Sequence, residues 1–323
     1  MKRILVTGAA GQIGTELVPA LLARYERAEV LATDIQGLPE PLPARAAFRT
    51  LDCTDGAAVD ALVAEHGIDT IYHLAAILSA TAEGVPQKAW RVNMGGLYNV
   101  LEAARERDAA VFIPSSIAAF GPETPADPTP QDTVQRPTTI YGVSKVAGEL
   151  LCDYYHTRFD VDTRGVRYPG LISYAAPPGG GTTDYAVEIF HAALRDGRYT
   201  CYLEPDTQLD MMYMPDALRA AMELMDAPAT ALQHRNAFNI AAMQLTPASL
   251  AEAIRDHIPT FDVAYDVDPR RQRIAESWPR RVDDSAARKE WGWAPAHDLA
   301  SMVEDMLARL ADRLGVASPV GGS

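Results

Sequence analysis

The sequence predicts an α/β protein in which a doubly wound parallel sheet carries a smaller C-terminal lobe. Short apolar runs alternate with helical patterns through the first half of the chain, and a glycine-rich turn follows the first run. Apolar strands separated by helices are typical of a parallel sheet covered on both faces. Right-handed crossovers then lead to the doubly wound arrangement.

The expected strands are short runs rich in apolar and β-branched residues. They are Ile4–Thr7, Val30–Thr33, Thr70–Leu74, Val111–Pro114 and Val161–Tyr168. Between them, apolar residues recur at intervals of three and four, which predicts crossover helices. These helices are Gln12–Tyr25, Ala57–His66, Pro86–Arg107 and Tyr141–Phe159.

The alternation stops after Tyr168. Pro177–Gly181 is a loop that can continue neither a helix nor a strand. Helical spacing then resumes at Asp184–Leu194 and near Pro215–Met225, Pro247–His257 and Leu299–Leu314. We therefore expect a large domain over residues 1–170 and a smaller lobe formed mainly by 171–316, with some segments returning to the sheet. Residues 317–323 are expected to fray.

Charge and apolar content limit the classes of partner. The net charge is −14, from 29 basic and 43 acidic residues, and Arg270, Arg271 and Arg273 form the only basic cluster. This balance argues against a nucleic acid or an anionic membrane as partner. The chain also has no run of 18 apolar residues that could span a bilayer.

The three cysteines are Cys53, Cys152 and Cys201, which form no CxxC pair. Neither a disulfide framework nor a structural zinc site is expected, and we predict no metal. Buried thiols in a reducing cytoplasm are the expected state. The N-terminus opens directly as a strand, without the pattern of a signal peptide, so we expect a cytoplasmic location.

A glycine loop joins the first strand to the first helix. It contains Gly8, Gly11 and Gly14, with Gln12 and Ile13 between the last two. Such glycines let the backbone approach a pyrophosphate at a helix N-terminus, as in Rossmann domains. The spacing is GxxGxxG rather than GxGxxG, and a plain tight turn is the alternative interpretation.

Two carboxylates follow the next strands. Asp34 lies twenty residues beyond Gly14 at the end of the second strand, where it can accept both ribose hydroxyls of NAD and repel the extra phosphate of NADP. Its alternative role is a cap. Asp52, at the end of a third strand, could reach the adenine side, or simply form a solvated turn. The cofactor we expect is NAD, bound by residues 1–170.

Tyr141 and Lys145 open a long predicted helix, four residues apart and therefore on one face. An adjacent ammonium favours the tyrosinate, which predicts a lowered tyrosine pKa and a usable base. Ser115 and Ser116 follow an apolar strand, at the end where doubly wound sheets bind ligands. A serine there can hydrogen-bond a reacting oxygen. A solvated helix face and a loop cap are the alternatives.

These motifs together resemble the extended short-chain dehydrogenase/reductase family in order and spacing, over roughly residues 2–310. The residues that carry the resemblance are Gly8–Gly14, Asp34, His73–Ala76, Asn93, Pro114–Gly121, Tyr141–Lys145, Arg167–Gly170 and Asp283–Trp293. The resemblance implies a catalytic set of Ser116, Tyr141 as base and Lys145. It also implies cofactor contacts for Leu74, Ala75, Ala76, Asn93, Tyr168 and Pro169. His73 is then a buried strand-end residue.

Within that family the chain resembles the short-chain type of L-threonine 3-dehydrogenase, through Leu78–Ser79, Arg167–Ser173 and Gly179–Phe190. The implied reaction is NAD-dependent oxidation of the β-hydroxyl of L-threonine to 2-amino-3-oxobutyrate. The residues expected to contact this substrate are Ser79, Ser116, Tyr141, Gly181, Thr182, Thr183, Asp184 and Trp278. Capping roles for Thr182, Thr183 and Asp184, and packing between the lobes for Trp278, remain open.

Two other functions remain open. A nucleotide-sugar epimerase or dehydratase of the same fold would use the basic residues Arg270, Arg271, Arg273, Arg280 and Arg281. A non-catalytic NAD sensor or scaffold is the second, because fold alone does not fix function.

By analogy with the family, the helices Pro86–Arg107 and Tyr141–Phe159 are expected to pair across a two-fold axis in a homodimer.

Overall fold

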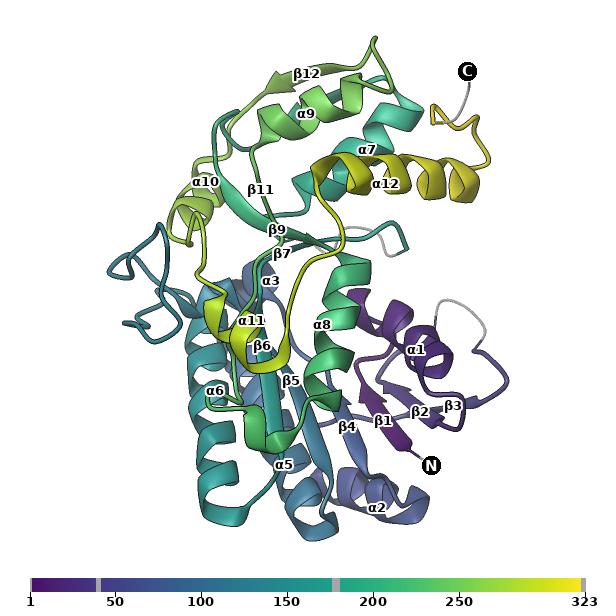
Figure 1. Ribbon diagram of the computed structural model, residues 1–323, viewed down its shortest axis with the longest axis vertical. Helices are drawn as coiled ribbons and strands as arrows, with labels where there is room; N and C mark the ends of the chain where they lie inside the picture. Colours follow the sequence, from purple (N-terminus) through teal and green to yellow (C-terminus); the bar gives the residue numbers. More distant parts are fainter. Residues whose placement is uncertain (1, 39–41, 176–180, 321–323) are drawn as a thin grey trace.

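The computed structural model describes residues 2–38, 42–175 and 181–320, so most of the predicted loop Pro177–Gly181 and the last residues of the tail lie outside the described residues. A seven-stranded sheet forms its centre, in the order β10-β6-β5-β4-β1-β2-β3 (Figure 1). Every neighbouring pair in it is parallel. The strands are β1 (Arg3–Thr7), β2 (Glu29–Asp34), β3 (Ala46–Thr50), β4 (Thr70–His73), β5 (Ala110–Ser116), β6 (Thr163–Tyr168) and β10 (Phe238–Asn239). The doubly wound sheet predicted from the sequence is confirmed.

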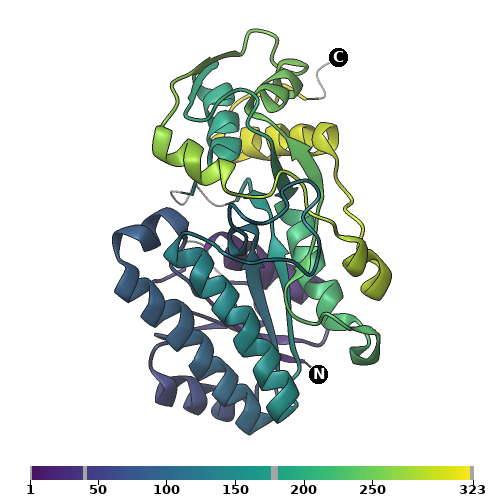
Figure 2. The ribbon, with the colours of Figure 1, turned by 90° about the vertical axis from the view of Figure 1, so that its left-hand side faces the viewer.

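Two helical layers cover this sheet. One face packs on α2 (Gly56–His66), α5 (Gly96–Arg107) and α6 (Ile140–Phe159), with a core that includes Leu5, Val63 and Val100. Figure 2 shows these blue to teal helices side by side. The other face packs on α1 (Gln12–Arg24), α8 (Met214–Asp226) and α11 (Ser285–Trp291). Apolar residues on alternating strand positions, such as Leu5 and Val6, therefore enter opposite cores.

Two predicted elements differ from the structure. The predicted helix Pro86–Arg107 is divided into α4 (Pro86–Trp90), a π-helical turn (Arg91–Gly95) and α5. The strand β3 was expected only as a third strand ending at Asp52, without a start, because this edge strand is largely exposed and its residues do not form a continuous apolar segment. Asp52 accordingly lies two residues beyond the end of β3 rather than at its end.

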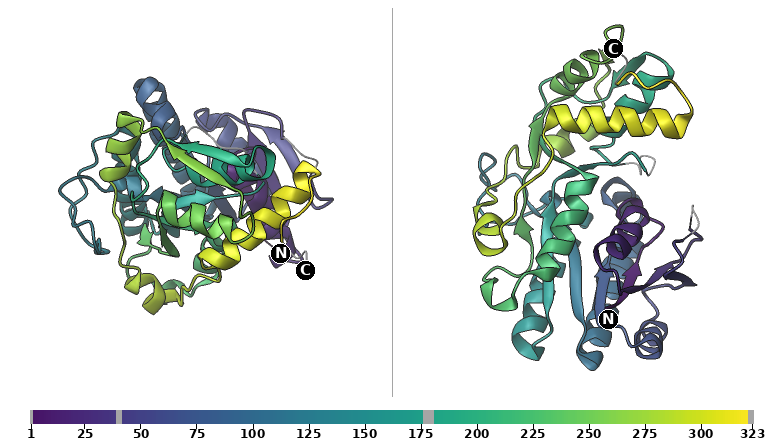
Figure 3. Two further views of the ribbon diagram at one scale, coloured as in Figure 1. Left: turned by 90° about the horizontal axis from the view of Figure 1, so that it is seen from above. Right: turned by 45° about the vertical axis from the view of Figure 1, so that its right-hand side comes forward.

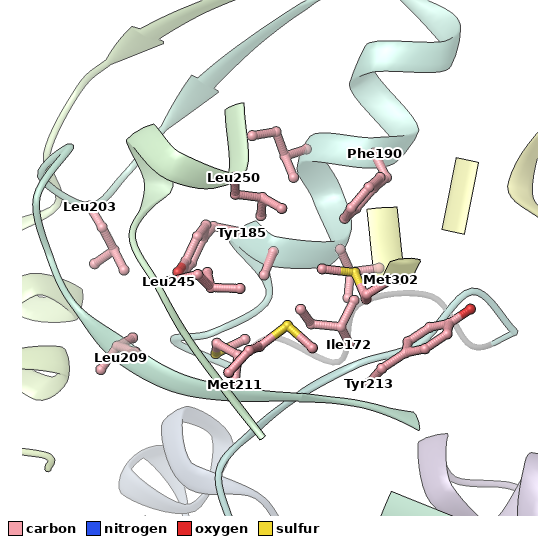
Figure 4. Packing of buried hydrophobic residues seen from close by; sticks show 14 of the residues in the cluster. Ile172, Tyr185, Phe190, Leu203, Leu209, Met211, Tyr213, Leu245, Leu250 and Met302 are labelled. Carbon is pink, nitrogen blue, oxygen red and sulfur yellow. The ribbon is translucent and has the colours of Figure 1, made fainter. Parts of the chain in front are cut away.

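The smaller lobe lies above the C-terminal ends of the sheet (Figures 1 and 3). It contains the three-stranded sheet β11-β9-β7 and the pair β12-β8. Its strands are β7 (Gly170–Ile172), β8 (Arg198–Cys201), β9 (Leu209–Tyr213), β11 (Met243–Leu245) and β12 (Asp262–Tyr265), and its helices are α7 (Tyr185–Arg195), α9 (Pro247–Arg255), α10 (Pro269–Glu276) and α12 (Leu299–Leu314). Figure 4 shows Phe190, Met211 and Leu250 meeting in its core.

The core of the smaller lobe continues into the large domain. The same apolar cluster contains Tyr185 and Met211 from the lobe together with Phe120 and Tyr141 from the large domain. Burial of continuous apolar surface stabilises the position of the lobe relative to the strand ends. None of the helices in the described part of the chain is both long enough and apolar enough to cross a membrane.

Candidate active site

The glycine loop packs tightly beneath the start of α1. Gly8 has a φ of +72°, and a Cβ added there would lie 2.7 Å from the backbone nitrogen of Ala75. A Cβ on Gly14 would lie 2.4 Å from the carbonyl oxygen of Gly8. Both positions therefore need glycine, because a side chain would collide with backbone. The loop places the amides of the first turn of α1, which begins at Gln12, beside an open cleft.

Asp34 lies next to this loop. Its carboxylate accepts hydrogen bonds of 3.0 Å from the amides of Ala10 and Gln36. These two bonds fix the carboxylate at the end of β2, where a ribose bound along the loop would lie. Asp52 is placed differently. It is exposed and accepts hydrogen bonds from the amide and hydroxyl of Thr54, which lower its pKa and form a local turn; its contact with the adenine side stays a prediction.

The cleft has a volume of about 470 Å³ and lies between the C-terminal strand ends and the smaller lobe. It brings together most of the residues that the sequence singled out. From the large domain these are Gly8, Gly11, Gln12, Ile13, Gly14, Leu74, Ala76, Ser79, Ser116, Tyr141, Lys145, Tyr168 and Pro169. From the segments beyond residue 170 they are Gly181, Thr182, Thr183, Asp184 and Trp278.

Ser116, Tyr141 and Lys145 meet at the floor of the cleft. Ser116 ends β5, and its hydroxyl is close enough to the phenol of Tyr141, the second residue of α6, to lower the pKa of that phenol. The ammonium of Lys145 donates a hydrogen bond of 2.6 Å to the carbonyl oxygen of Pro114. It also lies 5.3 Å from the ring centre of Tyr141. The cap of α6 is Thr139, whose hydroxyl accepts a hydrogen bond from the amide of Gly142 and so fixes the first turn.

Burial displaces the two ionisable groups in opposite directions. It raises the pKa of Tyr141 to about 12, and the Ser116 hydroxyl opposes this rise. Burial also lowers the pKa of Lys145 to about 8, against the attraction of Glu149. The sequence led us to expect a lowered pKa for Tyr141. That expectation is wrong for this arrangement, because desolvation of the phenol outweighs its neighbours.

The two adjacent serines have different partners. The Ser115 hydroxyl donates to Glu149, a buried carboxylate that also pairs with Arg167. Ser116 instead contacts Tyr141 and accepts a hydrogen bond of 3.2 Å from the amide of Ala118. Only Ser116 is thus in position to share a reacting oxygen with Tyr141.

Asn93 and Ala75 do not line the cleft. They line a smaller pocket of about 40 Å³, which shares Leu74, Ala76 and Lys145 with the cleft. Asn93 lies in the π-helical turn, accepts a hydrogen bond of 2.8 Å from the amide of Ile77, and donates one of 3.2 Å to the hydroxyl of Ser144. Asn93 therefore holds the segment before Ser79 against α6, and π-helical turns of this kind occur frequently at functional sites.

His73 lies at the end of β4, as expected of a buried strand-end residue. Its Nδ1 is 2.8 Å from the hydroxyl of Thr7, and burial together with Lys145 lowers its pKa to about 3. The imidazole is therefore neutral at physiological pH. Its place beneath the glycine loop, rather than in the cleft, suits a structural role.

The loop before α7 forms the lobe side of the cleft. Thr182 is buried, and its hydroxyl has no hydrogen-bond partner among the described residues. Asp184 precedes α7 but makes no side-chain cap; its carboxylate accepts a hydrogen bond of 2.8 Å from the amide of Gly181. Trp278 is buried both in the lobe core and at the cleft, so it packs between the lobes and faces the site.

Charge in the cleft is sparse. Of the described residues that line it, Lys145 and Asp184 are the charged ones. Arg271 instead lies over the ring of Tyr202, at 4.1 Å, and Arg281 pairs with Asp127 at 2.7 Å. A diphosphate usually binds several arginine or lysine side chains. Among the described residues, we also find no group of three His, Cys, Asp or Glu side chains that could hold a metal ion.

Sequence reasoning missed Glu149 and Arg167 as parts of this site. Both are buried beneath Ser115, and Arg167 donates to both carboxylate oxygens of Glu149, at 3.1 and 2.9 Å. The signal available was the spacing of Glu149, four residues after Lys145 and eight after Tyr141. That spacing places it on the same helix face.

A Rossmann sheet with Ser116, Tyr141 and Lys145 at its strand ends defines an extended short-chain dehydrogenase/reductase. A model of the NAD dependent epimerase/dehydratase family matches residues 4–241, and the chain belongs to that family. NAD is its cofactor, and the cradle formed by Gly8, Gly14 and Asp34 fits a dinucleotide.

The similar proteins cover nearly the whole chain. An uncharacterized epimerase/dehydratase of Staphylococcus haemolyticus is 53% identical, over 97% of this chain and 99% of that protein. The structure of L-threonine dehydrogenase from Clostridium difficile is 52% identical, with a TM-score of 0.95 over 98% and 99% of the two chains. A GalE-like L-threonine dehydrogenase from Cupriavidus necator, in its holo form, is 54% identical, with a TM-score of 0.92 over 95% and 99%.

Proposed function

We propose that the chain is an NAD-dependent L-threonine 3-dehydrogenase, which oxidises the β-hydroxyl of L-threonine to 2-amino-3-oxobutyrate. The observation that carries the proposal is the lobe side of the cleft. There the unpartnered hydroxyl of buried Thr182 and the carboxylate of Asp184 lie in the same cleft as Tyr141. A hydroxyl donor suits the carboxylate of an amino acid, and a carboxylate suits its ammonium.

Each residue of the site has a separate role in the proposed reaction. Ser116 holds the substrate oxygen, and Tyr141 as phenolate takes the proton from that oxygen. Bound NAD supplies the acceptor for the hydride that leaves the β-carbon. Lys145 binds a ribose hydroxyl and supports the phenolate by its charge. Ser79, Thr182 and Thr183 hold the amino-acid carboxylate, and Trp278 covers the substrate.

The proposed division of the chain follows from these roles. Residues 1–170 bind NAD, through the glycine loop, Asp34, Leu74, Ala76, Tyr168 and Pro169, and carry the catalytic groups. Residues 171–316 mainly bind substrate. The three free, buried cysteines support a reducing, cytoplasmic location.

Two alternatives are less well supported. A nucleotide-sugar substrate would need basic groups in the cleft. None of the five arginines considered for that role is among the described residues that line it, and two of them, Arg271 and Arg281, engage Tyr202 and Asp127. A non-catalytic NAD sensor would not need Ser116 beside Tyr141, because that pair serves proton transfer.

The test is an absorbance assay for NADH, in which the purified chain is mixed with NAD and L-threonine and, in parallel, with NAD and UDP-sugars. We expect NADH to accumulate with L-threonine alone. Conversion of a UDP-sugar without net NADH, and no reaction with L-threonine, would instead identify an epimerase. No reaction with either substrate, together with tight NAD binding, would favour the sensor.

A further inference from the structure

The last three residues of β5 each contact a different residue of α6. The three contacts join the Pro114 carbonyl oxygen to Lys145 at 2.6 Å, Ser115 to Glu149, and Ser116 to Tyr141. On α6 these partners are spaced by four residues and share one face. Two of the three contacts involve groups assigned to catalysis. The third, that of Glu149, has no role in the mechanism above.

Several hydrogen bonds hold the carboxylate of Glu149 in place. Its carboxylate accepts hydrogen bonds from Arg167 Nε and Nη2, at 3.1 and 2.9 Å, from Gln135 Nε2 at 2.7 Å, and from the Ser115 hydroxyl. The exposed fractions of Glu149 and Arg167 are 7% and 6%. A buried carboxylate that accepts this many hydrogen bonds is fixed in position.

Lys145 and Glu149 both line the smaller pocket of about 40 Å³. Glu149 is the only carboxylate among the described residues of that lining. The other titratable or charged groups near Lys145 are Tyr141 and Cys152 on α6, His73 from β4, and Arg167 from β6 behind Glu149. Cys152 and His73 are neutral by burial, since the pKa of the thiol is raised and that of the imidazole is lowered.

We propose that Glu149 is a positioning residue whose charge, across the pocket that both side chains line, keeps the Lys145 side chain an ammonium. The role of Lys145 itself rests on the proposed function. Desolvation acts against the charged form of a buried lysine, and the one opposing carboxylate is Glu149. Without it, Lys145 releases its proton at a lower pH and no longer binds a ribose hydroxyl as a cation.

The direct test is NMR titration of the full chain with isotope-labelled lysine. The sequence has four lysines, so the signal of Lys145 can be assigned by its loss in Lys145→Met. The titration midpoint of Lys145 in the wild-type chain should lie near 8. In Glu149→Gln it should fall by about one pH unit or more, the usual effect of losing an adjacent opposite charge.

The matched control is Asp153→Asn, which removes an exposed carboxylate of the same helix and leaves an oxygen that can still accept from Asn236. It should leave the Lys145 midpoint unchanged. If Glu149→Gln does not fold, the double variant Glu149→Gln/Arg167→Met removes the ion pair without leaving a buried unpaired charge. Its Lys145 midpoint should also fall.

A second measurement is the dissociation constant for NAD as a function of pH, without substrate. Affinity that depends on the ammonium is lost as the pH rises through the Lys145 midpoint, so Glu149→Gln should lose it at lower pH than the wild type. An unchanged Lys145 midpoint in a folded variant would overturn the proposal, even if the melting temperature falls. Neither measurement uses L-threonine. A failure of this proposal can therefore be distinguished from a failure of the proposed function.

Discussion

The ammonium of Lys145 lies 5.3 Å from the ring centre of Tyr141, and burial moves the pKa values of these two groups apart. The pKa of Tyr141 is raised to about 12, and that of Lys145 is lowered to about 8. In the proposed reaction the phenol must lose its proton while the ammonium keeps its own. The same change in pH therefore favours one requirement and opposes the other.

This relationship predicts opposite pH effects on two kinetic constants. As the pH rises from about 7 to about 9, kcat for L-threonine oxidation should increase, because a general base works deprotonated. Over the same range KM for NAD should begin to rise near the Lys145 pKa of about 8. Steady-state kinetics at several pH values measure both constants. A kcat that falls with rising pH would contradict the role of Tyr141 as base.

Cofactor selectivity is expected to depend on the charge of Asp34. The carboxylate already accepts the amides of Ala10 and Gln36, so Asp34→Asn keeps an acceptor and the local shape while removing the charge. The ratio of kcat/KM for NAD to that for NADP should fall by about tenfold or more, since repulsion of the 2′-phosphate is lost. Asp52→Asn serves as control, because Asp52 is exposed and is bonded to Thr54 rather than to the glycine loop. If Asp34→Asn and Asp52→Asn have the same ratio of kcat/KM for NAD to that for NADP, the ribose of the cofactor does not lie beside Asp34.

Thr182 should affect substrate recognition without affecting folding. Its buried hydroxyl has no partner, so Thr182→Val leaves no broken hydrogen bond and should keep or raise the melting temperature. KM for L-threonine should rise by about tenfold or more, as expected for a lost hydrogen bond to a charged group, with kcat little changed. Thr50→Val, at the edge strand β3, is the control. An unchanged KM would remove Thr182 from the substrate site.

Exposed apolar side chains on α5 and α6 support the proposed homodimer. Tyr98, Leu150 and Tyr154 are 50%, 63% and 54% exposed. Sedimentation at micromolar concentration should give a dimer, and Leu150→Lys/Tyr154→Lys should give a monomer, because lysine ammonium groups would be desolvated there. Ile35→Lys changes an equally exposed residue away from these helices and should remain dimeric. A wild-type monomer would refute the assembly.

Most strands of the sheet and most residues of the cleft could be predicted from the sequence. Strands β1, β2, β4 and β5 contain continuous apolar runs, so their pattern reveals them, and motif residues follow their C-terminal ends. The bounds of the edge strand β3, expected to end at Asp52, were not predictable because the strand is buried on neither face along its length. The π-helical turn at Asn93 leaves no mark in the apolar spacing, so Pro86–Arg107 resembled one helix.

Electrostatics was the least predictable part of the site. The spacing of Tyr141 and Lys145 correctly placed them on one face, but a pKa depends on desolvation, which the spacing does not contain. Asp52 likewise had a plausible motif position, yet the hydroxyl of Thr54 two residues later binds it in a local turn. The pairing of Glu149 with Arg167 joins α6 to β6, and contacts between distant elements of this kind emerge only in the folded chain.

The central claim is that Tyr141 is the base for L-threonine oxidation, and Tyr141→Phe tests it most directly. The variant keeps the ring and its packing in the apolar cluster around Phe120, but removes the ionisable oxygen. NADH production from NAD and L-threonine should show kcat reduced by roughly 10²-fold or more, the usual effect of losing a general base. The dissociation constant for NAD should change little. Near-normal turnover of L-threonine by Tyr141→Phe would contradict the account.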